Sequence, residues 1–216
     1  MQAVTLVLAC FGGLVLLVAL SRWLARRRWA SLGHLALSLA LLLAAAWLQP
    51  VVANLSTYQP RRFDGPVAQV FCERTASHAH RITLTRLPSG HMQVFEVTGD
   101  EWRIDARTLV WQGLAVELGL RPGFRLDRLS TRFVRTPEPE NAAPSSYALG
   151  EEKGEDIWAQ SRTGTTWARY VVADHAYGPW LPLAEGARYE VWFEAKGLVA
   201  RPANESATKA MAASAP

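Results

Sequence analysis

Two long apolar runs near the amino terminus constrain this chain more than any other feature. Residues 3–20 and residues 32–48 carry no formal charge. As helices, each run is long enough to cross a hydrocarbon layer of roughly 30 Å. A segment in lipid has to satisfy its backbone polar groups internally, which requires a helix. We therefore expect a transmembrane hairpin over residues 1–55, and Pro50 predicts that the second helix ends there.

The segment between the two runs sets the expected orientation. Residues 21–31 contain Arg22, Arg26, Arg27 and Arg28, and residues 1–55 contain no Asp or Glu. Short loops rich in Lys and Arg stay on the cytoplasmic side of a membrane. The sequence therefore predicts two spans, with the amino terminus and the carboxyl-terminal domain both on the side of the membrane away from the cytoplasm.

Other residues of the first 55 refine this expectation. Trp23, Trp29 and Trp47 fall near the predicted membrane edges, where tryptophan is enriched, so they are expected to be interface anchors. The Gly12-Gly13 pair favours close helix packing, within the hairpin or in a homo-oligomer. A cleaved signal peptide is disfavoured because the first run lacks a positively charged start. A buried hairpin of a soluble protein leaves the charge asymmetry unexplained.

The charge of the rest of the chain argues against nucleic-acid binding. The chain has 23 Lys and Arg against 19 Asp and Glu, and the excess of four lies within residues 1–55. The remainder is formally neutral, so it has no basic surface excess for a phosphate backbone. We expect no nucleic-acid partner.

The remainder has the pattern of a β-rich domain. After a polar linker at residues 56–65, residues 80–86 and 92–105 alternate apolar and polar side chains, as half-buried strands do. Gly99-Asp100 is interpreted as a tight hairpin turn, and residues 87–90 as a second turn. The predicted fold is α+β: a helical hairpin, then a mainly antiparallel extracytoplasmic domain over residues 66–202.

Two further segments complete this prediction. Residues 154–164 favour a helix with Glu155 and Asp156 at its start. Residues 203–216 have few large apolar side chains and are expected to form a disordered tail.

The sharpest local motif is His78-Ala79-His80. On a strand both imidazoles would point to the same side, and Cys72 and His91 would complete four metal ligands if neighbouring strands paired suitably. The alternative is two solvated histidines at a strand entrance, with Cys72 a buried apolar residue.

Several motifs of established enzyme classes are missing from the sequence. The chain has no Gly-x-Ser-x-Gly or His-Glu-x-x-His motif and no glycine-rich phosphate loop. We therefore assign no catalytic residue and no cofactor. The Arg and Asp alternation of residues 100–107 and 124–132 predicts a charged strand face with cross-strand pairs.

Four stretches carry a resemblance to a known family: residues 99–107, 125–130, 186–191 and 197–202. Together with the hairpin they resemble small proteobacterial inner-membrane proteins with two spans, often labelled "cation/multidrug efflux pump". The resemblance supplies no catalytic residue. Two spans without a buried charge make a poor stand-alone pump, so the label implies association with a transport system.

These observations favour a membrane-anchored extracytoplasmic binding or scaffolding protein of the bacterial envelope. Its expected partners are the lipid bilayer and an envelope or transport protein. Two alternatives stay open: an exported metal-binding protein or enzyme that uses Cys72, His78, His80 and His91, and a transporter subunit that oligomerises through the hairpin.

Overall fold

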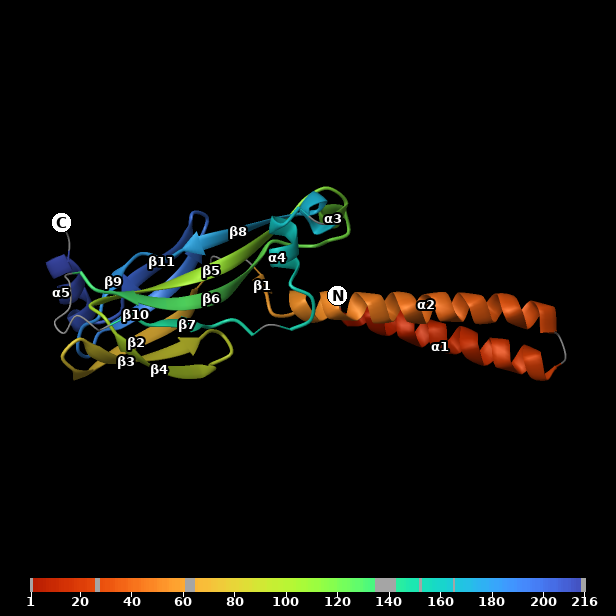
Figure 1. Ribbon diagram of the computed structural model, residues 1–216, viewed down its shortest axis with the longest axis horizontal. Helices are drawn as coiled ribbons and strands as arrows, with labels where there is room; N and C mark the ends of the chain where they lie inside the picture. The colour runs from red at the N-terminus through yellow and green to blue at the C-terminus, as the bar shows by residue number, and fades with distance from the viewer. Residues whose placement is uncertain are drawn as a thin grey trace.

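The computed structural model describes residues 2–25, 28–60, 65–134, 143–151, 153–164 and 166–214. Two long amino-terminal helices, α1 (Gln2–Leu24) and α2 (Arg28–Leu55), run antiparallel and project from a β-rich domain (Figure 1). Both helices are long and apolar enough to cross a membrane, and less than a quarter of each span is buried.

Small side chains form the contact between α1 and α2. Buried positions recur every seven residues: Thr5, Gly12 and Ala19 in α1, and Ser31, Ser38 and Ala45 in α2. The Ser38 hydroxyl donates to the Gly12 carbonyl at 2.8 Å, and the Ser31 hydroxyl donates to the Ala19 carbonyl at 2.7 Å. A Cβ atom on Gly12 would lie 3.1 Å from Leu42. The two backbones therefore approach closely, as the small residues predicted.

The helices are longer than the apolar runs predicted. Helix α1 continues past Arg22, and α2 begins at Arg28, which shortens the expected 21–31 connection. The prediction that α2 ends at Pro50 was wrong, since the helix continues to Leu55. A proline costs one backbone hydrogen bond, and here the following turn is held by burial of Val51 and Val52.

The domain consists of two antiparallel sheets packed face to face. Sheet A, with the central order β1-β6-β5-β8, contains β1 (Gln59–Pro60), β5 (Glu101–Trp111), β6 (Gly123–Arg132), β7 (Ser146–Ala148), β8 (Val171–Tyr177) and β9 (Leu181–Pro182). Sheet B, with the order β11-β10-β2-β3-β4, contains β2 (Pro66–Ala76), β3 (Ala79–Arg86), β4 (Met92–Thr98), β10 (Arg188–Glu194) and β11 (Gly197–Pro202). The predicted α+β class, with a mainly antiparallel domain, is confirmed.

Large side chains fill the space between the sheets. Phe124 of sheet A stacks on Phe193 of sheet B at 4.3 Å between ring centroids, and Trp102 meets Tyr189 edge to face at 5.5 Å. All four side chains are almost completely buried. Alternation along each strand thus provides one apolar face per sheet, and the two faces form the main core.

Gly99 and Asp100 do not form the predicted hairpin turn. They carry the chain from β4 in sheet B to β5 in sheet A. The Asp100 amide donates to the Arg132 carbonyl at 2.9 Å, and a Cβ atom on Gly99 would lie 3.0 Å from that oxygen. A change of sheet and a hairpin have the same local pattern, so the sequence did not distinguish them. The turn over residues 87–90, which joins β3 to β4, is confirmed.

The expected disordered tail instead contains a helix, α5 (Glu205–Ser214). The Asn204 carboxamide accepts from the Ala207 and Arg188 amides at 3.0 Å and donates to the Gly186 carbonyl at 2.7 Å. Ala207 is fully buried in the main core and Met211 packs beside it. The prediction failed because small side chains are enough to hold a helix in place when its first turn is capped and it packs directly on a core.

Short helices cover the hairpin-proximal end of sheet A: α3 (Leu114–Glu117), α4 (Ile157–Arg162) and the 3-10 helix η1 (Thr166–Arg169). Helix α4 confirms the prediction for residues 154–164, and the Asp156 carboxylate caps it by accepting from the Ala159 amide at 3.1 Å.

A second apolar cluster joins α2 to the domain. It consists of Val51, Leu109, Trp111, Ala115, Ile157, Trp158 and Val171, and we call it the junction cluster. Gly154 lies against the backbone of α2, where a Cβ atom would be 2.1 Å from the Pro50 carbonyl oxygen. The last turn of α2 is therefore part of the domain, and no free linker separates the two.

Candidate functional site

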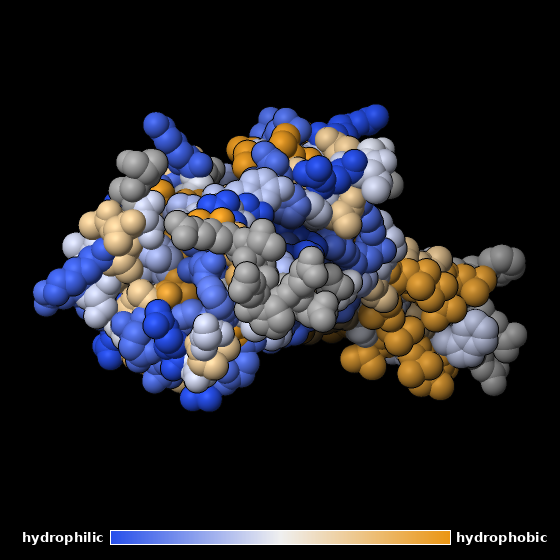
Figure 2. Space-filling view, turned by 60° about the vertical axis from the view of Figure 1, so that its left-hand side comes forward, coloured by the Kyte–Doolittle hydropathy of each residue, from blue (hydrophilic) through white to orange (hydrophobic). Residues whose placement is uncertain are grey.

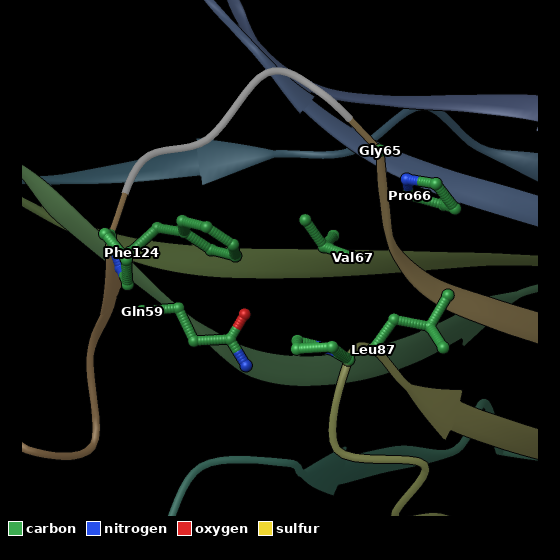
Figure 3. A pocket seen from close by; sticks show the side chains of 8 residues that line it. Gln59, Gly65, Pro66, Val67, Leu87 and Phe124 are labelled. Atoms are coloured by element: carbon green, nitrogen blue, oxygen red, sulfur yellow. The ribbon is translucent and has the colours of Figure 1, made fainter.

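A cleft of about 490 Å³ opens between the two sheets at the end of the domain nearest the hairpin. It is lined by Gln59, Pro60, Gly65, Pro66, Val67, Leu87, Pro88 and Phe124 (Figure 3). These residues come from β1, the start of β2, the β3–β4 turn and the start of β6. The cleft therefore forms where short β1, paired with Phe124 and Gly123 of β6, extends sheet A.

The lining of this cleft is suited to binding an apolar group. The Phe124 ring and Val67 point toward one another, and the Gln59 amide reaches in beside Leu87 (Figure 3). The volume is within the range of small-ligand sites, which are mostly apolar with a few polar groups that fix orientation. None of the eight lining residues is an acid, a base or a nucleophile, so these side chains support binding and supply no acid–base or covalent chemistry.

A smaller hollow of about 240 Å³ lies beside the cleft and shares Gln59 and Pro60 with it. Its other lining residues include Leu55 at the end of α2 and Tyr58. Burial raises the pKa of the Tyr58 phenol to about 12, against the opposing effect of the Arg125 guanidinium, whose carbon lies 5.1 Å from the ring centroid. The phenol is thus neutral at physiological pH and forms an uncharged wall between α2 and the cleft.

The charged face predicted for sheet A is present. Arg132 pairs with Glu101, its direct cross-strand neighbour, at 2.5 Å. Arg107 lies 2.7 Å from Asp127 and 2.8 Å from Asp156. The Arg132–Glu101 and Arg107–Asp127 pairs, which join β5 to β6, confirm the expected cross-strand arrangement, whereas Asp156 lies at the start of α4.

Aromatic rings cover the same guanidinium groups. The Trp180 ring lies 4.6 Å from the guanidinium carbons of both Arg103 and Arg132, and Trp158 lies 4.7 Å from that of Arg107. Arg103 also lies 3.2 Å from Asp105, whose carboxyl pKa is raised because it is buried. These cations are already paired and stacked, so this face stabilises the sheet and offers few groups to a ligand.

The structure does not bring the four predicted metal ligands together. His78 lies in the β2–β3 turn with a left-handed backbone (φ 57°), and its Nδ1 atom is 2.7 Å from Asp100. His80 lies within β3 and is 4% exposed. The two imidazoles do not share a strand face because β3 begins between them, at Ala79. In the part of the chain that the structure describes, no three His, Cys, Asp or Glu residues cluster as metal ligands would.

Cys72 and His91 are also apart from one another. Cys72 is fully buried in β2, opposite Ile82, and burial raises the pKa of its thiol to about 12. His91 is exposed in the turn before β4, at the other end of β3 from His80. The interpretation of Cys72 as a buried apolar residue fits its position in the main core.

His80 is buried, and neither of its ring nitrogens has a hydrogen-bond partner among the residues that the structure describes. Burial and then the nearby Arg74 lower the pKa of its imidazole. The neutral form is therefore favoured in the folded domain.

The expected orientation residues lie at the ends of the hairpin. Arg22, Trp23 and Trp47 are exposed, the two rings by 50% and 64%. Arg26 and Arg27 lie outside the described residues, and for Arg28 and Trp29 the structure describes the backbone of α2 alone. Trp23 lies at the end of α1 nearest the arginine segment, and Trp47 lies one turn before the junction cluster.

Sequence reasoning missed the cleft because its walls come from four segments spread over 65 positions of the chain, from Gln59 to Phe124. Pro60, Pro66 and Pro88 were a weak signal, since prolines favour strand ends and turns. Their convergence depends on the pairing of β1 with β6, which local patterns do not reveal.

Compared with protein-family models, curated proteins and solved structures, the chain shows no significant match to any of them.

Proposed function

We propose that this chain is a membrane-anchored binding or scaffolding protein of the bacterial envelope. The hairpin spans the inner membrane, the arginine segment is cytoplasmic, and the β-sandwich stands on the periplasmic surface. One observation carries the proposal: the apolar span of α2, Ser31–Leu55, is itself anchored in the domain, because Val51 near its end belongs to the junction cluster. Such a connection holds a folded domain at a fixed position against a bilayer.

The charges of the chain support the orientation. Arg22, Arg26, Arg27 and Arg28 lie between the two apolar runs, whereas residues 56–216 have equal numbers of acids and bases. Retaining the arginine segment in the cytoplasm requires export of everything beyond Leu55.

The cleft supports a binding role over catalysis. Its apolar walls and single Gln59 amide fit an apolar side chain or chain segment of an envelope or transport partner, and its opening lies close to the membrane end of the domain. The scattered positions of Cys72, His78, His80 and His91 give no support to the metal-binding alternative.

Reporter fusions test the compartment. Alkaline phosphatase fused after Pro216 should be active, because this enzyme folds only in an oxidising compartment. GFP fused at the same site should not fluoresce, because GFP that is exported as an unfolded chain does not form its fluorophore. The matched pair after Ala25, between the spans, should give the opposite result. A fluorescent GFP and inactive phosphatase after Pro216 would overturn the proposed topology.

Photo-crosslinking in native membranes tests the binding role. A photoreactive amino acid at Gln59 should give a discrete crosslinked species that is missing from the same substitution at Thr208, an exposed residue of α5. Equal products at both positions, or none at Gln59, would contradict a partner at the cleft.

A further inference from the structure

The loop between β5 and β6 exposes an unusual run of apolar side chains. Leu114, Val116 and Leu118 are 60%, 53% and 83% exposed. Two residues of the same loop point inward: Ala115 is buried in the junction cluster, and Leu120 packs against it. The loop is thus fixed to the domain through Ala115 and Leu120, while Leu114, Val116 and Leu118 stay exposed.

This loop lies where the apolar span of α2 meets the domain. Ala115 shares the junction cluster with Val51 of α2. Figure 1 shows α3, the centre of the loop, beyond α4 from the end of α2, at the end of the domain from which the hairpin projects. Trp47 is 64% exposed and precedes Val51 by one helical turn, about 6 Å. If Trp47 marks a membrane interface, the loop lies at the depth of the lipid headgroups.

The polar residues around the loop favour an anionic lipid surface. Arg121 lies near the end of the loop, and Arg162 and Arg169 lie in the neighbouring short helices; all three are exposed. Glu117 is the single acid within residues 112–121. Apolar side chains flanked by arginine are the composition of segments that lie in the headgroup region, where each basic residue adds attraction to acidic lipids.

We propose that Leu114, Val116 and Leu118 insert into the bilayer interface, between the headgroups and the acyl chains of the leaflet at which α2 ends. This inference rests on the proposed anchoring of the hairpin. It adds a second contact with lipid, made by the domain itself. Together with the rigid junction, that contact fixes the tilt of the sandwich and the direction in which its cleft opens.

Spin labels on the full chain test this proposal. In a Cys10→Ser background, Val116→Cys carries a nitroxide in vesicles of phosphatidylethanolamine and phosphatidylglycerol. Cys72 is buried and does not compete for the label. Power saturation compares collision with oxygen, which concentrates in lipid, and with a nickel chelate, which stays in water. The label at position 116 should collide more with oxygen, and Leu118→Cys should repeat the result.

Val134→Cys is the matched control. Val134 is also a well-exposed valine, at 63%. It follows the end of β6, and its amide donates to Asp100 beside the start of β5, so it lies at the end of sheet A opposite to the loop between β5 and β6. That label should collide several-fold more with the nickel chelate than the label at position 116 does. Equal, water-like behaviour of positions 116, 118 and 134 would overturn the proposal.

A label within the hairpin separates this outcome from failure of the anchoring itself. Leu17 lies within α1 and is 65% exposed. An oxygen-accessible label from Leu17→Cys with a water-exposed position 116 would refute the loop contact alone. A water-exposed label at position 17 would refute the proposed membrane anchor, and with it the loop contact.

Discussion

The hairpin and the sandwich use apolar side chains in opposite ways. In the sandwich, the large side chains Trp102 and Tyr189 are buried and meet between the sheets. In the hairpin, small residues such as Gly12 and Ser38 are buried at the contact, while Leu17 and Leu43 are 65% and 60% exposed (Figure 2). Water drives large apolar groups inward, whereas lipid solvates them and leaves close backbone packing to hold helices together.

The two patterns meet at the last turn of α2. Val51 and Val52 are 2% and 3% exposed, so large apolar side chains point inward again as soon as the helix enters the domain. The change occurs within one turn after Trp47. This contrast supports the proposal that two different solvents surround the two regions.

The largest expected effect comes from making the same substitution in both regions. Leu84 is fully buried in β3 and Leu17 is exposed on α1. In lipid nanodiscs, Leu84→Ala should lower the free energy of unfolding of the domain by about 2–5 kcal/mol, because it removes buried methyl groups and leaves a cavity. Leu17→Ala should change it by less than about 0.5 kcal/mol. Urea titration followed by tryptophan fluorescence gives both values, and similar losses for both variants would contradict the contrast.

The next effect tests the rigid junction. Gly154 has φ +66° and no room for a Cβ atom beside Pro50, whereas Gly90 has φ +70° with open space around it. Gly154→Ala should destabilise the domain by about 2–4 kcal/mol, since a steric clash adds to the cost of a left-handed backbone.

Gly90→Ala is the control for the junction. It places an alanine in a left-handed backbone conformation without a steric clash, and this alone should destabilise the domain by about 1–2 kcal/mol. Thermal unfolding of the two variants in the same nanodiscs measures the difference. Equal melting temperatures of the two variants would show that α2 is not tightly packed against the domain at Gly154.

The smallest effect concerns pH and separates the sandwich core from its surface. The pKa of His80 is lowered in the folded domain, so the unfolded chain binds more protons below its ordinary pKa of about 6.5. Stability should therefore fall as the pH drops through 6.5 toward the folded pKa. His80→Leu should therefore reduce the loss of stability between pH 7.5 and pH 5.

The groups that act on His80 besides burial are Arg74, Asp100, Glu185 and His78, and all remain in that variant. His91→Leu removes an exposed histidine and serves as the control. Denaturant titrations at the two pH values measure the change, and an unaltered pH dependence in His80→Leu would assign the acid sensitivity to another group.

Several features could be predicted from the sequence because they depend on local patterns. The two apolar runs indicated α1 and α2, alternation along residues 80–86 indicated a strand, and acids before residue 157 indicated α4. The charged face of sheet A was also expected, since cross-strand pairing places opposite charges side by side.

Other features needed the tertiary structure. Gly99 and Asp100 carry the chain between two sheets, and α5 is ordered because Ala207 finds a place in the main core. The cleft exists because Gln59 pairs with Phe124, which is 65 positions away in the chain.

The sequence by itself therefore determined which segments are apolar throughout, which have one apolar face, and where the positive charge lies. The tertiary structure decided which faces meet, and with that the change of sheet at Gly99, the separation of His78 from His80, and the rigid entry of α2 into the domain. The physical reason is that periodicity is a property of one segment, whereas burial and cavities depend on partners that are distant along the chain.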